Sequence, residues 1–181
     1  MKKKSGLLFA FFLVCTYVVV FSQEKEAGPI IKDFGKVFKI EDADILVDPA
    51  KDYKVVFDIM NTPEGNDKIN ASIETAARFL NMHAQHGVPA EQLSVALVVH
   101  NKASKDIITN GAYKQRFGVD NPNTKLIEAL VAANVQVIFC GQSSKSRGFP
   151  KEDLIPGVKL SLSAMTSLLQ LQDENYKLIK F

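Results

Sequence analysis

The feature that most constrains the fold is the alternation of short apolar runs with amphipathic segments. Tyr53–Met60, Leu93–Val99 and Val135–Phe139 are rich in β-branched and aromatic residues, and the last two are almost continuously apolar. Such runs are typical of parallel strands that are buried on both faces. Segments with helical periodicity lie between them, at Asp67–Gln85 and Thr124–Ala133. The pattern predicts a three-layer α/β/α domain with a mainly parallel sheet.

Two further strands bring the expected sheet to about five. Val158–Ser161 and Tyr176–Lys180 alternate apolar and polar residues, as edge strands do. Ser163 is placed to cap a helix between them that runs through Leu171. Asn123 is placed in the same way to cap the helix at Thr124.

The N-terminus has the pattern of an export signal. Three lysines at positions 2–4 precede the apolar residues 7–21, and Ser22 precedes a charged stretch. The apolar core is shorter than the ~20 residues of a spanning helix, which favours cleavage after Ser22 over a retained anchor. We therefore expect a signal peptide at 1–22, an N-terminal extension or arm at 23–51 and an α/β domain at 52–181. The mature protein is expected in the periplasm, free of the membrane.

Charge and cysteine content narrow the function. The net charge of +2 includes the three lysines of the signal, so the mature chain is near neutral and nucleic acid is not an expected partner. Of the two cysteines, Cys15 lies in the signal, which leaves Cys140 as the single mature thiol. It is a reactive thiol, the site of an intermolecular bridge, or a buried, inert apolar residue.

The expected strands end in polar residues that would meet at one rim of the sheet. Cys140 follows the third strand and begins a turn into a short helix, where backbone N–H groups favour the nucleophilic thiolate. It is therefore the candidate catalytic residue. The expected substrate-binding residues at the same rim are Asn61, His100, Asn101, Gly141 and Gln142.

The histidines suggest no metal site. His100 can act as a base toward Cys140 or bond local backbone at a strand terminus, and the second role is favoured. His83 and His86 lie near one helix end without a third ligand. We expect no metal and no cofactor. No Cys-x-x-Cys pair is present, which argues against thioredoxin-type chemistry.

Several blocks of the sequence resemble the DsrE/DsrF-like sulfur-relay family, in particular its exported branch. The blocks are Tyr53–Asp58, Val98–His100, Asn121–Asn123, Val137–Ser143 and Leu154–Val158. The resemblance implies a DsrE/YchN-like three-layer fold and a homo-oligomer, trimeric or hexameric. It also implies that Cys140 accepts sulfur as a persulfide and passes it on.

The sequence thus favours a sulfur carrier or sulfurtransferase that uses one cysteine. Its expected partners are small sulfur species or a thiol donor, such as polysulfide, thiosulfate or a small persulfide. The alternative is a small-ligand-binding or oligomeric assembly module of the same fold, which uses the rim without covalent chemistry.

Overall fold

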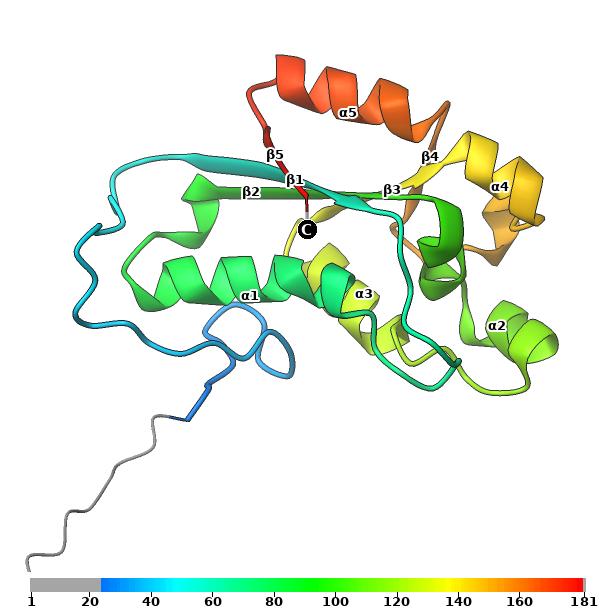
Figure 1. Ribbon diagram of the computed structural model, residues 1–181, viewed down its shortest axis with the longest axis horizontal. Helices are drawn as coiled ribbons and strands as arrows, with labels where there is room; N and C mark the ends of the chain where they lie inside the picture. The colour runs from blue at the N-terminus through cyan, green and yellow to red at the C-terminus, as the bar shows by residue number, and fades with distance from the viewer. Residues whose placement is uncertain (1–23, 181) are drawn as a thin grey trace, which may run out of the picture.

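The core of the protein is a five-stranded sheet in which every pair of neighbouring strands is parallel (Figure 1). The computed structural model describes residues 24–180. The strand order is β4-β3-β2-β1-β5. The strands are β1 (Tyr53–Ile59), β2 (Leu93–Val99), β3 (Gln136–Cys140), β4 (Lys159–Ser161) and β5 (Lys177–Ile179). The predicted α/β class and the two edge strands are confirmed.

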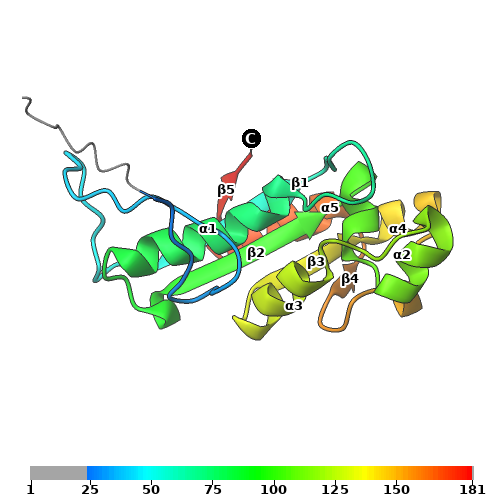
Figure 2. The same cartoon turned by 90° about the horizontal axis from the view of Figure 1, so that it is seen from below.

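Helices cover the two faces of the sheet unequally. The α-helices are α1 (Ala71–Gln85), α2 (Asn110–Phe117), α3 (Thr124–Ala132), α4 (Gly141–Arg147) and α5 (Ala164–Asp173). Short 3₁₀ segments are η1 (Ala90–Gln92), η2 (Asn101–Ile107) and η3 (Lys151–Asp153). Helices α1 and α3 lie side by side on one face, and α5 lies on the other (Figures 1 and 2). We call these the α1 face and the α5 face.

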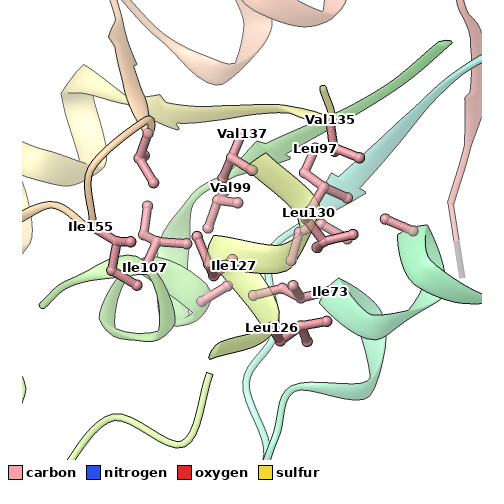
Figure 3. Close-up of a cluster of buried hydrophobic side chains, with 14 of the residues drawn as sticks. Ile73, Leu97, Val99, Ile107, Leu126, Ile127, Leu130, Val135, Val137 and Ile155 are labelled. Atoms are coloured by element: carbon pink, nitrogen blue, oxygen red, sulfur yellow. The ribbon is translucent and has the colours of Figure 1, made fainter. Parts of the chain in front are cut away.

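The larger core fills the space between the sheet and helices α1 and α3. Leu97, Val99 and Val137 of the central strands pack on this face. Ile73 of α1 and Ile127 of α3 close the cluster from the other side (Figure 3). The alternate residues of the same strands, Val56, Ala96 and Val98, form a smaller cluster with Leu171 of α5 and Tyr176. Burial on both faces explains why these strands are nearly continuous apolar runs.

One helix start and one helix cap differ from the sequence prediction. Helix α1 begins at Ala71 rather than Asp67, because the side chain of Asn70 accepts hydrogen bonds from the backbone N–H groups of Ser72 and Ile73. Asn123 precedes α3 as expected but makes no cap of its own. Its Oδ1 instead accepts from the backbone N–H of Asn70 at 2.7 Å. Ser163 does cap α5, through Thr166.

A buried carboxylate ties the loop after β1 to the segment after β2. Asp106, in η2, is 1% exposed. Its oxygens accept from Nδ2 of Asn70 at 2.7 Å and from Oγ1 of Thr62 at 3.0 Å. Burial raises the pKa of Asp106 from 3.8 to about 6, against the effect of the hydrogen bonds from Asn70 and Thr62. This network lies on the α1 side of the strand ends.

The segment from residue 24 to the start of β1 runs along α1. Asn81 of α1 is fully buried and holds a loop of this segment, since its side chain bonds the N–H and C=O of Ile31 and the carbonyls of Phe34 and Gly35. The predicted signal at 1–22 lies outside the described residues. Among residues 24–180, no helix is long and apolar enough to cross a membrane.

Candidate functional site

The register of three neighbouring strands brings three polar side chains to one end of the α5 face. Asp58 of β1 pairs with Val98 of β2, and Val98 pairs with Ile138 of β3. Side chains alternate along a strand, so His100 and Cys140, each two residues further on, point to the same face as Asp58. Backbone pairing continues to this point, because the N–H of His100 donates to the carbonyl of Ile59 at 2.9 Å.

These three side chains line a cavity of about 300 Å³ beneath α5. The start of α5 supplies the opposite wall of this cavity, and Gln142 of α4 borders it. The complete lining is Asp58, His100, Cys140, Gln142, Ser163, Ala164, Met165 and Leu168. Met165 is 73% exposed, so the cavity opens to solvent beside an apolar side chain. We call it the Cys140 cavity.

The thiol of Cys140 is held in an environment that favours the thiolate. The residue is only 5% exposed, and burial by itself raises the thiol pKa. Hydrogen bonds from the N–H groups of Ser143, Ala164 and Gln142 and from the Ser143 hydroxyl outweigh burial, so the net effect is a lowered pKa. Helix α4 has only seven residues, and these local donors account for the shift.

Asn101 contacts the residues around Cys140 through its backbone and its side chain. Its backbone N–H donates to Oγ of Ser143 at 3.0 Å, which leaves the hydroxyl hydrogen of Ser143 for the sulfur. Asn101 takes a left-handed conformation, with φ of 53°. Its side-chain oxygen accepts from the guanidinium of Arg147 in α4. Asn101 is therefore placed to orient Ser143.

Gly141 and Gln142 have different surroundings although they are adjacent. A Cβ at Gly141 would lie 2.4 Å from the carbonyl oxygen of Ser161, so glycine permits close contact between the cysteine turn and β4. Gln142 is exposed and borders the cavity, and its Nε2 donates to the carbonyl of Leu162 at 3.4 Å. Of the two, Gln142 is the one placed to contact a ligand.

The His100 ring bonds a carboxylate rather than the backbone. Its Nε2 lies 2.6 Å from Oδ1 of Asp58, and the other oxygen, Oδ2, lies 2.8 Å from Nζ of Lys180. The Asp58 side chain is 8% exposed, and this burial raises its pKa. The bonds to Lys180 and His100 outweigh burial, so the pKa is lowered and Asp58 is a carboxylate at neutral pH.

The structure separates Asn61 from the other predicted residues. Asn61 lies two residues after Ile59, which belongs to the larger core, so alternation along the chain directs Asn61 to the α1 face. Its backbone carbonyl accepts a hydrogen bond from Nδ2 of Asn70 at 2.7 Å. It does not line the Cys140 cavity. Sequence reasoning missed Asp58, Ser143, Lys180 and the start of α5. A charged residue within the apolar β1 run was the one available signal, for Asp58.

The described residues hold no group of three or more His, Cys, Asp and Glu side chains arranged to bind a metal ion. The Cys140 cavity combines a cysteine of lowered pKa with a histidine–carboxylate pair. This arrangement suits nucleophilic attack on a small electrophile.

Comparison with known proteins assigns the chain to a family. The model of the DsrE/DsrF-like family matches residues 54–181, which is more than half of the chain. The chain therefore belongs to the DsrE/DsrF-like family. No curated protein matches the sequence.

Two solved structures have the same fold. A protein of unknown function from Methanobacterium thermoautotrophicum, MTH1491, superimposes with a TM-score of 0.55 at 18% identity, over 72% of this chain and 100% of that one. The ychN protein from E. coli gives a TM-score of 0.53 at 22% identity, over 71% of this chain and 99% of that one. At these identities the likeness concerns the fold.

Proposed function

We propose that the protein is a periplasmic sulfur carrier or sulfurtransferase in which Cys140 holds a persulfide. Membership of the sulfur-relay family supports this class of function. The observation that carries the proposal is the hydrogen bonding of the buried Cys140 sulfur by N–H groups and a hydroxyl, which lowers the pKa of a thiol that burial alone would raise. The same donors would stabilise the anion of a persulfide.

The location outside the cytoplasm is part of the proposal and depends on residues 1–22. A basic start, an apolar core and Ser22 before a charged stretch support an export signal. The mass of the protein recovered from a periplasmic extract tests it. A chain that begins at Gln23 would support export with cleavage, and a full-length chain in the cytoplasm would refute it.

The sulfur chemistry is tested by intact-mass spectrometry before and after exposure to a sulfur donor. We expect a gain of whole sulfur atoms that a reductant reverses. Cys140→Ser should abolish the gain without unfolding the protein. Sulfur uptake that persists in Cys140→Ser would overturn the proposal.

One observation favours a second candidate, a non-covalent binding module of the same fold. Cys140 is 5% exposed, which is also expected of a structural cysteine. This candidate requires that iodoacetamide, a small thiol reagent, modify Cys140 only after denaturation. Rapid modification of the native protein at neutral pH would exclude it.

We also propose that the protein forms a homo-oligomer, a trimer or hexamer. The support is an exposed apolar surface on α5 and the segment before it, where Leu162, Met165 and Leu169 are 71%, 73% and 64% exposed. Among the helices of residues 24–180, α5 is the one that lies across this face of the sheet (Figure 1), so a second copy could extend that layer. We call these three residues the α5 surface.

A further inference from the structure

We propose that the Cys140 cavity accepts a small organic persulfide in its protonated form, R–S–SH, and that His100 carries the proton during sulfur transfer. This inference rests on the proposed function and adds a donor class and a second functional residue. Inorganic donors, thiosulfate and polysulfide, are the alternatives that it excludes.

The lining of the cavity favours a carbon-containing donor. Ala164, Met165 and Leu168 form one wall, all from α5. An alkyl group on the donor would remove the exposed thioether of Met165 from water, whereas an inorganic anion would gain nothing from this wall. A volume of about 300 Å³ lies at the small end of ligand cavities, which limits the donor to a few carbon atoms.

The charges around the cavity disfavour an anionic donor. None of the lining residues is Lys or Arg, and the negative charges among them are the carboxylate of Asp58 and the thiolate of Cys140. Two cations beside the lining are already paired, because Lys180 binds Oδ2 of Asp58 and Arg147 binds the side chain of Asn101. The N–H donors at the sulfur already serve the Cys140 thiolate. Lys180 offsets the charge of Asp58, so a thiosulfate dianion would meet the Cys140 thiolate without an unpaired Lys or Arg among the lining residues.

The pairing with Asp58 defines which nitrogen of His100 can exchange a proton. Nε2 faces the carboxylate at 2.6 Å and so keeps its hydrogen. Nδ1 is then the nitrogen that gains and loses a proton, on a ring that lines the cavity. The groups that face this ring are Asp58 and Lys180 from the β1 side and Cys140 from β3, with Arg147 of α4 bonded to the next residue, Asn101.

The transfer step balances without an external oxidant or reductant. The Cys140 thiolate attacks the outer sulfur of R–S–SH, a new S–S bond forms, and the bond between the two donor sulfurs breaks. The imidazole of His100 accepts the proton of the attacked sulfur, and the electron pair of the broken bond leaves on R–S⁻. His100 then gives this proton to R–S⁻, which becomes R–SH. The products are R–SH and Cys140–S–S⁻, and the imidazole is restored.

The donor class is tested by comparing rates of sulfur uptake, measured by intact mass, from three donors. These are the persulfide of 2-mercaptoethanol, thiosulfate and inorganic tetrasulfide. We expect the alkyl persulfide to react faster by roughly tenfold or more. Met165→Lys should reduce the ratio between these rates, because the added positive charge attracts the anions thiosulfate and tetrasulfide. Gln170→Lys is the control, because it adds the same charge to α5 at an exposed position outside the cavity.

The outcomes separate this inference from the proposed function. No gain from any donor would overturn the proposed function itself. Uptake from thiosulfate or tetrasulfide that equals or exceeds uptake from the alkyl persulfide would overturn the donor class alone.

His100→Gln tests the proton transfer, since glutamine keeps an N–H group for Asp58 but cannot carry the proton. We expect sulfur uptake to slow about a hundredfold. The pH dependence of the rate that remains should follow the ionisation of Cys140 only. Alkylation by iodoacetamide should proceed at the wild-type rate, because iodide leaves without a proton. If both reactions slow equally, His100 has a structural role and the proton-transfer assignment is wrong.

Discussion

Nε2 of His100 lies 2.6 Å from Oδ1 of Asp58, although the two residues are 42 positions apart in the sequence. The contact depends on the register of β1 and β2, in which Asp58 pairs with Val98, two residues before His100. A slip of one residue would turn Asp58 to the opposite face of the sheet. The pair is therefore a property of the sheet, and the helices only cover it.

Loss of the Ser143 hydroxyl should raise the pKa of the Cys140 thiol. In Ser143→Ala the backbone N–H donors remain, but one hydrogen bond to the thiolate is lost. A hydrogen bond to a charged group contributes roughly 1.5–3 kcal/mol, which corresponds to a rise of about one to two pKa units. The pH dependence of iodoacetamide alkylation measures it. Ser146→Ala, an exposed change on the same helix, is the control, and an unchanged midpoint in Ser143→Ala would contradict the assignment.

Gly141→Ala should destabilise the fold, whereas Gly111→Ala should not. The added methyl at Gly141 would meet the backbone oxygen of Ser161 at 2.4 Å, so β4 must shift, at a cost of about 1–3 kcal/mol. Gly111, inside α2, has nothing within 4 Å of its ideal Cβ position. Alanine there should stabilise the protein by up to about 1 kcal/mol. Urea denaturation compares the two, and equal effects would contradict the contact with β4.

Asp106→Asn should make the free energy of unfolding depend less on pH between pH 4 and pH 6. The pKa of Asp106 rises from 3.8 to about 6 on folding, so the folded state binds this proton more tightly. The stabilisation is complete below the unfolded value and is lost as the pH rises through about 6. This rise in the pKa of Asp106 corresponds to a difference of about 3 kcal/mol in the free energy of unfolding between low and neutral pH.

Urea denaturation across this pH range checks the effect of Asp106. Asparagine keeps one oxygen acceptor, and the Thr62 hydroxyl can accept from the new amide. Asp120→Asn is the control, because that carboxylate forms an exposed pair with Lys114. A pH slope in Asp106→Asn equal to that of the wild-type protein would contradict the prediction.

Charges on the α5 surface should dissociate the proposed homo-oligomer. Light scattering after size-exclusion chromatography should give a trimer or hexamer for the wild-type protein and a monomer for the double variant Leu162→Asp, Leu169→Asp, since a buried unpaired charge opposes association. Ile45→Asp is the control, because Ile45 is 92% exposed in the segment before β1. A monomeric wild-type protein would refute assembly, and an intact oligomer in the double variant would place the interface elsewhere.

The strands and the position of Cys140 were predictable because they depend on local pattern. A strand buried on both faces must be almost continuously apolar, and Leu93–Val99, in which Ser94 is the one polar residue, meets that condition without reference to the rest of the chain. Cys140 ends such a run, so its place at the rim follows from the run itself.

The remaining parts of the site depend on which face each side chain takes and on which helix crosses the sheet. Asn61 was placed at the rim because parallel strands end together, but alternation directs it away from the α5 face. Asp58 and Lys180 meet only through the pairing of β1 with β5. The wall formed by α5 could be assigned only from the tertiary structure. The sequence of this segment predicts an amphipathic helix, but it does not indicate which strand ends the helix covers.

Helix α5 begins with two adjacent residues that perform different tasks. The N–H of Ala164 hydrogen-bonds the Cys140 sulfur, and the side chain of Met165 borders the entrance to the cavity. Any change in helix position that widens the entrance for a larger donor also moves a group that stabilises the thiolate. Within this scaffold, a shift of α5 therefore changes the choice of donor and the nucleophilicity of the cysteine together, whereas a side-chain substitution at Met165 can change the choice of donor alone.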